Sequence, residues 1–215
     1  MFNFNHDQNA ANPNPNNYCG GYSLAAIATR LQPMVNHNPQ IVYNILRGSQ
    51  VGLGQNSQIL VNATNLGGTD ILLPSTFLAA QYAQLNYALY LNRQTYLNAA
   101  QLLLLQLGIV ADNIITEETQ AIGGQHNVQQ IPDNLQQFLN AVAANNHQYW
   151  LVLVNNATHW VAIERDPNGQ YCIYNPAGGI NAVANIAGDV ITYTDSHNIA
   201  HTDNWSGIAI SVINT

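Results

Sequence analysis

The spacing of apolar residues along the chain changes at about residue 147. Up to that point apolar residues recur at helical spacing, and the clearest such segment is SLAAIATRL at residues 23–31. Further helices are expected over residues 38–47, 75–85, 93–107 and 132–145. Beyond that point, β-branched and aromatic runs separated by turn residues predict strands over residues 149–154, 159–164, 171–174, 189–193 and 207–213. A helical half followed by an antiparallel sheet is the α+β arrangement.

The same pattern predicts a single domain over residues 1–215 in three parts. Residues 1–17 form an extended arm, because its prolines disfavour helix, residues 18–146 are mainly helical, and residues 147–215 are mainly β. Apolar stretches fall short of the ~18 residues that would span a bilayer. The first residues have neither a basic start nor an apolar run, so no signal peptide is visible. We expect a cytoplasmic protein, or one exported into a host cell by a signal-independent route.

Charged side chains are unusually scarce. They make up 7% of the residues, whereas roughly 25% is typical of soluble domains. The four basic residues are all arginine, lysine is absent, and the chain holds 31 Asn and 19 Gln. A formal charge of −7 without lysine excludes the basic patch that nucleic acid or an anionic membrane requires.

Cys19 stands at the mouth of the first expected helix and is followed by Gly20 and Gly21. A helix N-terminus carries unsatisfied N–H groups and a partial positive charge, which favour the nucleophilic thiolate form of a cysteine. The glycines would let a substrate backbone approach the sulfur. Taken alone, a free cysteine can equally be a small buried apolar residue. The second cysteine, Cys172, lies in an expected strand, and we expect both thiols to be free.

His159 begins an expected strand, HWVAIE, directly after a small turn. A histidine at a strand mouth suits a general base that partners a thiolate, and Trp160 can shield the imidazole from water. The turn at residues 166–169 predicts a hairpin whose second strand ends at Asn175, beside His159. The amide oxygen there could accept a hydrogen bond and fix the tautomer of the imidazole. A turn asparagine and a surface histidine are the simpler interpretations, but residue order and hairpin geometry together favour catalysis.

Three segments, NNYCGGYSLAAIA, THWVAIE and YNPAGG, resemble papain-like (clan CA) cysteine peptidases. In that superfamily a nucleophilic Cys begins a central helix, and a His and an Asn or Asp follow on neighbouring strands. Cys19, His159 and Asn175 match this order. The Cys-Gly, His-Trp and Asn-Pro steps are also similar to the bacteriocin-processing peptidases of bacteria. The resemblance implies a papain-like fold, in which the nucleophile helix packs on the C-terminal antiparallel sheet.

The sequence departs from this family where the oxyanion donor is expected. Papain-like enzymes place a Gln about six residues before the Cys, and here that position is Pro13. Asn12, Asn14 or Asn16 could substitute, because an Asn amide also donates hydrogen bonds. Asn16 stands at the spacing of the acidic or amide residue in ovarian-tumour-type deubiquitinases. The backbone N–H of Cys19 is the other expected donor.

A second likeness competes with the first. The His-Trp and Asn-Pro steps, with NWSGIA at residues 204–209, resemble adenain-type and ubiquitin-like-protein-specific proteases. Ser206 would then occupy the nucleophile position, as a substitute or by coincidence. This alignment leaves Cys19 unexplained, so we prefer Cys19. His197 and His201 have the spacing of two metal ligands, but the Glu of the zinc-protease motif is absent, and we expect surface histidines, no metal and no cofactor.

The sequence therefore predicts a cysteine peptidase that cleaves peptide or isopeptide bonds. The same triad also performs glutamine deamidation or acyl transfer, and a papain-like binding module without catalysis is the further alternative, which the missing Gln favours. A chain without lysine cannot accept ubiquitin on a side-chain amine. That favours a bacterial effector or toxin that acts on ubiquitin or a ubiquitin-like protein, although compositional drift toward amides explains the same observation.

Overall fold

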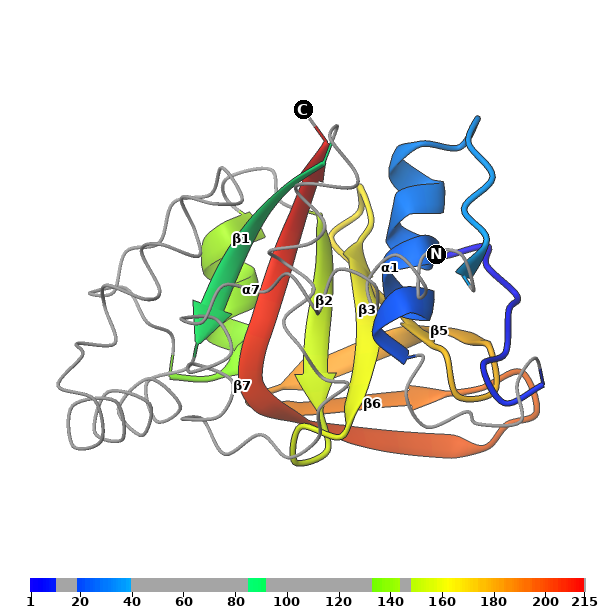
Figure 1. Ribbon diagram of the computed structural model, residues 1–215. Coiled ribbons are helices and arrows are strands. Elements are labelled where there is room, and N and C mark those ends of the chain that lie inside the picture. Colours follow the sequence, from blue (N-terminus) through cyan, green and yellow to red (C-terminus); the bar gives the residue numbers. More distant parts are fainter. Residues whose placement is uncertain (11–18, 40–84, 92–132, 144–147, 215) are drawn as a thin grey trace, which may run out of the picture.

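The computed structural model describes residues 1–10, 19–39, 85–91, 133–143 and 148–214 (Figure 1). Within these residues the helices are α1 (Cys19–Leu31) and α7 (Leu135–Ala143). The strands are β1 (Leu85–Leu91), β2 (Tyr149–Val154), β3 (His159–Arg165), β4 (Tyr171–Asn175), β5 (Ile180–Ala187), β6 (Val190–Thr194) and β7 (Ala200–Asn214).

All of these strands belong to one antiparallel sheet, in the order β1-β7-β2-β3-β4-β5-β6. The sheet closes on itself because the first part of β7, residues 200–204, pairs with β6. From Trp205 onward, β7 pairs with β2 and β1 instead. Strands β2 to β7 therefore form a closed six-stranded antiparallel barrel, with β1 added beside β7. Figure 1 shows β7 running along the lower edge of the barrel and then turning upward.

The turn within β7 lies close to Gly207. This residue has a φ of 88°, a conformation that side chains with a Cβ rarely adopt and that glycine reaches without strain. The pairing of β7 with β2 also shifts in register between Val152 and Val154. A shift of this kind increases local twist and bends the strand. Glycine and the irregular register together let one strand serve two parts of the barrel.

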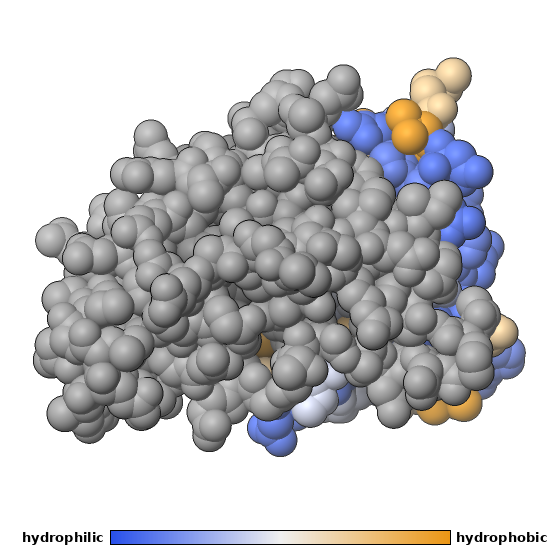
Figure 2. Space-filling model, in the orientation of Figure 1, coloured by the Kyte–Doolittle hydropathy of each residue, from blue (hydrophilic) through white to orange (hydrophobic). Residues whose placement is uncertain are grey.

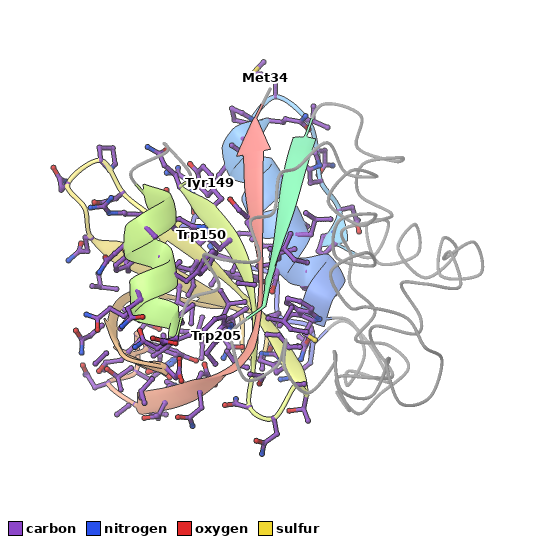
Figure 3. All side chains as sticks on the ribbon, turned by 90° about the vertical axis from the view of Figure 1, so that its left-hand side faces the viewer. Met34, Tyr149, Trp150 and Trp205 are labelled. Atoms are coloured by element: carbon purple, nitrogen blue, oxygen red, sulfur yellow. The ribbon has the colours of Figure 1, made fainter. Side chains whose placement is uncertain are left out.

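Side chains from all six barrel strands meet in one hydrophobic cluster, which is therefore the barrel interior, and one face of α7 joins it. The cluster consists of Leu135, Phe138, Leu139, Trp150, Val152, Val154, Val161, Ile163, Ile173, Ala182, Ala184, Ile186, Ile191, Tyr193, Trp205 and Ala209. Figure 3 shows Trp150 and Trp205 on the side of the sheet where α7 lies. The rings of Phe138 and Trp205 stack with their centroids 6.2 Å apart.

Helix α1 packs on the outer face of β3 (Figure 1). Its residues 19–28 are all buried apart from Gly20, and most of them are small, which lets the helix approach the sheet closely. A Cβ at Gly20 would lie 3.4 Å from the Trp160 ring. The Ser23 hydroxyl donates a hydrogen bond to the Trp160 carbonyl at 3.1 Å. These contacts hold the first turns of α1 against the start of β3.

The N-terminal residues 1–10 lie along β4 and the turn that follows it. The Phe4 ring meets the Tyr174 ring edge-on, with centroids 5.2 Å apart. The Tyr174 hydroxyl donates to the carbonyl of His6 at 2.6 Å, and the Gln8 N–H donates to the carbonyl of Pro176 at 3.0 Å. This part of the chain therefore braces the end of β4.

The expected papain-like α+β fold with a helical N-terminal half is wrong. The described residues are mostly sheet, and within residues 18–146 they form β1 as well as two short helices. Three strand segments were not anticipated. The inward positions of β5 are partly alanine and the first part of β7 is polar, so neither gives a clear apolar alternation, and β1 begins at Leu85, where a helix was expected to end.

Other expectations are confirmed. Helix α1 includes residues 23–31, and α7 lies within residues 132–145. The expected strands over 149–154, 159–164, 171–174 and 189–193 match β2, β3, β4 and β6 to within one residue at each end. The helix expected over 93–107 and most of the one expected over 38–47 lie outside the described residues.

The surface that the described residues contribute is mainly polar. Figure 2 shows hydrophilic residues over most of this part of the visible face, with small, separate hydrophobic areas. The large apolar side chains exposed among the described residues are Met1, Met34, Val35, Val183 and Ile199. Neither of the two described helices has the length and apolar character needed to traverse a membrane.

A buried carboxylate lies between α1 and β3. Glu164 is 2% exposed and accepts hydrogen bonds from Arg30 Nε at 3.1 Å and from Arg30 Nη2 at 2.5 Å. The Met1 amino group lies 3.3 Å from its other oxygen. A buried charge is tolerated only with such partners, because removal from water is costly. Arg30 therefore offsets the burial of Glu164 and ties the C-terminal end of α1 to β3.

We expect Arg30→Gln to lower the free energy of unfolding by about 1–3 kcal/mol, because it leaves Glu164 buried with one partner fewer. Arg30 is 38% exposed, which keeps the loss below that of a fully buried pair. The double variant Arg30→Gln with Glu164→Gln carries no buried charge and should recover part of the loss. Urea denaturation of the two variants measures the difference, and an equal loss in both would contradict the role assigned to Arg30.

Candidate active site

His159 opens β3 after a turn of unusual backbone geometry. Asn155, Asn156 and Ala157 have φ values of 56°, 56° and 63°, in the left-handed region that is unfavourable for residues with a Cβ. The Ala157 N–H donates to the Ser206 hydroxyl at 2.8 Å. The surrounding structure therefore stabilises a turn that would be unfavourable in isolation. This turn fixes the backbone position from which the His159 side chain extends.

The turn is also paired with β7 through Asn155. The backbone N–H of Asn155 donates to the carbonyl of Asn204 at 2.8 Å. In return, the Asn204 N–H donates to the side-chain oxygen of Asn155 at 3.1 Å. This reciprocal pair anchors the first residue of the turn to the barrel.

Asn175 ends β4 and lies beside His159. Residues 166–169 form the hairpin turn between the two strands, and Ala162 of β3 pairs with Tyr174 of β4. The Asn175 side-chain oxygen lies 2.8 Å from Nε2 of His159. The same oxygen also accepts a hydrogen bond from the Ala177 N–H at 2.9 Å, so the amide is held by the turn that follows it. Its oxygen therefore faces the imidazole, and Nε2 is the nitrogen that donates.

Cys19 is the first residue of α1 and is 4% exposed. Its thiol is close enough to the His159 imidazole to raise the pKa of that ring. Because Nε2 faces Asn175, Nδ1 is the imidazole nitrogen left for the sulfur. The structure thus brings together Cys19 from α1, His159 from β3 and Asn175 from β4, three segments that lie far apart in the sequence.

The pKa of His159 reflects these neighbours. Burial lowers this pKa, but the hydrogen bond and the charge of Cys19, the hydrogen bond of Asn175 and the charge of Asp203 together raise it by more. The net pKa lies above the ordinary value of 6.5. The imidazole of His159 therefore holds its proton to a higher pH than a free histidine does. The arrangement places a proton acceptor beside the Cys19 thiol.

Two further residues extend the site, and the sequence pattern did not single them out. The Asn175 amide nitrogen donates to the Tyr193 hydroxyl at 2.7 Å, and that hydroxyl donates to Asp203 Oδ2 at 2.8 Å. The other oxygen of Asp203 accepts from the Asn155 amide at 2.6 Å. Tyr193 and Asp203 are each 5% exposed. In the sequence, Asp203 is simply an acidic residue two positions after His201, and that spacing alone does not indicate a role in the site.

Other expected site residues have different surroundings. Asn12, Asn14 and Asn16 lie outside the described residues, so the oxyanion donors stay a prediction. The Trp160 ring lies against Gly20 of α1, and its shielding of the imidazole also stays a prediction. The Ser206 hydroxyl accepts from the turn before His159.

The pair His197 and His201 does not form a shared ligand set. His201 Nε2 bonds to Asp195 Oδ2 at 3.0 Å, whereas the backbone N–H of His197 donates to Asp195 Oδ1 at 2.8 Å. Among the described residues, no group of three or more His, Cys, Asp or Glu side chains is placed to hold a metal ion. Cys172 is 1% exposed and unpaired, and burial raises the pKa of its thiol.

Comparison of the chain with protein-family models, with curated proteins and with solved structures gives no match. The chemistry and geometry of the side chains described above are therefore what indicates a function.

We expect iodoacetamide to label Cys19 at least about tenfold faster than Cys172 at pH 7, because a cysteine with a basic imidazole beside it reacts faster than one without such a partner and with a pKa that burial raises. The pKa of His159 is raised, so its imidazole keeps a proton to a higher pH than a free histidine does. His159→Ala should slow labelling of Cys19 and leave that of Cys172 unchanged. Peptide mass spectrometry of timed samples measures both rates, with urea-unfolded protein as the accessibility control. Equal, slow labelling of both thiols would argue against an activated Cys19.

Proposed function

We propose that the chain is a thiol hydrolase that uses Cys19 as the nucleophile, His159 as the proton carrier and Asn175 as the residue that orients His159. One observation supports this most directly: Nε2 of His159 lies 2.8 Å from the Asn175 amide oxygen, and the Cys19 thiol is near enough to the same imidazole to raise its pKa. A nucleophile next to a base that a third group orients is the arrangement of nucleophilic catalysis.

In the proposed reaction, the Cys19 thiol gives its proton to Nδ1 of His159 and the thiolate attacks a substrate carbonyl carbon. The carbon–nitrogen bond then breaks, and the imidazolium gives its proton to the leaving amine. A water molecule next loses a proton to the imidazole and attacks the thioester, which releases the acid and restores the thiol. The Cys19 N–H, at a helix N-terminus, and an amide from residues 12–16 are the proposed oxyanion donors.

The leaving group decides which member of this reaction class applies. A peptide or isopeptide amine gives proteolysis, ammonia from a glutamine side chain gives deamidation, and an amine in place of water gives acyl transfer. We propose a protein or peptide substrate, with ubiquitin or a ubiquitin-like protein as the candidate that fits a chain without lysine, because such a chain offers no side-chain amine for modification. An effector or toxin delivered to a host cell is the context that this feature favours.

A non-catalytic binding module is the second candidate. The 4% exposure of Cys19 favours it, as does Pro13 at the position where papain-like peptidases carry a Gln. In that case the three side chains would stabilise the barrel end and a groove would bind a peptide without reaction.

Activity tests separate these candidates. Incubation with a peptide library and with linked ubiquitin chains should give one of three products detected by mass spectrometry: a shortened chain, a glutamine converted to glutamate, or an amine-linked adduct. We expect Cys19→Ala to abolish the product, since the covalent intermediate cannot form. The loss should exceed about 1,000-fold, the order of effect seen when a nucleophile is removed.

Ser206→Ala is the matched control for the competing nucleophile. It removes only the acceptor of the Ala157 N–H, so activity should fall by less than about tenfold, in line with the cost of one hydrogen bond. An inactive Ser206→Ala together with an active Cys19→Ala would reverse the assignment. Binding of a peptide without any product, in wild type and Cys19→Ala alike, would support the binding module.

A further inference from the structure

A continuous chain of hydrogen bonds leads from the imidazole to a buried carboxylate. It runs from His159 Nε2 to the Asn175 oxygen (2.8 Å), from the Asn175 nitrogen to the Tyr193 hydroxyl (2.7 Å), and from that hydroxyl to Asp203 Oδ2 (2.8 Å). Each donor in this chain points toward Asp203. The chain crosses β3, β4, β6 and β7 at one end of the barrel.

The direction of these bonds follows from the carboxylate. An ionised carboxylate only accepts hydrogen bonds, so Tyr193 must donate its hydroxyl proton to Asp203. The lone pairs of Tyr193 are then left to accept from the Asn175 NH2 group, and the Asn175 oxygen is turned toward His159. Nε2 must then carry a proton, and Nδ1 is left for the thiol of Cys19.

We infer that Asp203, acting through Tyr193 and Asn175, is a positioning residue that fixes the tautomer and orientation of His159. The inference rests on the proposed function, because it assigns how that site is held in its reactive form. Neither Asp203 nor Tyr193 contacts the sulfur, so neither is a catalytic residue.

A second arm of the network reinforces the first. Asp203 Oδ1 accepts from the Asn155 amide at 2.6 Å, and Asn155 begins the left-handed turn that precedes His159. One carboxylate therefore holds the hydrogen-bond partner of the imidazole and also the backbone from which the imidazole extends. Both of its oxygens have partners, which is the condition for burying a charge without a large penalty.

The surroundings keep Tyr193 in the donor form. Burial raises the pKa of the Tyr193 hydroxyl above its ordinary value, and the charge of Asp203 raises it further, so the phenol keeps its proton. The His201 ring stacks on the Tyr193 ring with centroids 5.1 Å apart, and Asp195 bonds to His201. Among the described residues, the titratable groups that act on His159 are Cys19 from α1 and Asp203 from β7. Tyr193 from β6 follows Asn175 in the series of hydrogen bonds.

The first test is made on the wild-type protein. Nitrogen chemical shifts of ¹⁵N-histidine-labelled protein report which imidazole nitrogen carries the proton, and comparison with His159→Gln serves only to assign the His159 signals. We expect neutral His159 to be protonated at Nε2. A neutral His159 protonated at Nδ1 would overturn the inference.

The second test uses Asp203→Asn and Tyr193→Phe. Removal of the negative charge disfavours the imidazolium, so the titration midpoint of His159 should fall by about 0.5–1 pH unit in Asp203→Asn. Tyr193→Phe removes only the hydroxyl, and it should give a smaller shift in the same direction and a mixture of tautomers. Because this variant keeps the ring that stacks on His201, it carries the test if Asp203→Asn does not fold.

Asp195→Asn is the matched control. It removes the same charge from the same end of the barrel, but Asp195 bonds to His201 and to its own turn. We expect its His159 midpoint and tautomer to equal those of the wild type. Unchanged titration in both folded network variants, or an equal shift in Asp195→Asn, would overturn the inference.

These readouts are independent of the proposed reaction. If no substrate is hydrolysed but the tautomer and midpoint respond as expected, the proposed function fails and the positioning role stands. If hydrolysis depends on Cys19 but the midpoint is insensitive to Asp203, the positioning role fails alone. Where hydrolysis is found, the alkaline limb of its pH profile should move to lower pH in Asp203→Asn by the same amount as the midpoint.

Discussion

The candidate site depends on one long strand that pairs with two parts of the barrel. The first part of β7 pairs with β6 and the later part with β2, and the strand turns near Gly207. This pairing closes the sheet, and it also places Asp203, Asn204 and Ser206 against the turn that precedes His159. Because the turn is unfavourable in isolation, its geometry requires these contacts. Barrel closure and the position of His159 are therefore a single constraint.

The three proposed triad residues could be found from the sequence because each is marked by a local feature. Cys19 precedes a helical repeat, His159 follows a turn and begins an apolar strand, and Asn175 ends the partner strand of a hairpin that Pro-Asn-Gly marks. Hairpin geometry is short-range, so the position of the turn was enough to predict that residues 159 and 175 lie side by side. In the structure, Nε2 of His159 lies 2.8 Å from Oδ1 of Asn175. The packing of α1 on β3, which brings Cys19 to His159, is in contrast a long-range contact, because Gly20 faces the ring of Trp160.

The rest of the network and the barrel were not predictable in this way. Asp203 lies on a stretch of β7 where polar residues occupy both faces, since it forms the polar end of the barrel. Alternation of apolar and polar residues is what reveals a strand, and such a stretch lacks it. The apolar run that begins at Gly207 therefore predicts that a strand starts there. In the structure the strand starts at Ala200, and Gly207 lies at a bend within it. Closure adds a long-range pairing of β6 with β7, and a sequence pattern does not encode which edges meet.

The amide-rich composition has a physical counterpart in this network. Asn155 and Asn175 each join a charged or titratable group to another part of the site, with the amide oxygen accepting at one end and the NH2 group donating at the other. An amide transmits hydrogen-bond direction without titrating, so the polarity set by the carboxylate of Asp203 is preserved at every pH where that carboxylate is ionised. A charged residue in the position of Asn175 would place its own charge beside the imidazole and fix the site by electrostatics. Because Asn175 and Tyr193 are neutral, the carboxylate of Asp203 is kept away from the imidazole. Nε2 of His159 bonds to Asn175, and Nδ1 is left for the thiol of Cys19 in both charge states of the imidazole.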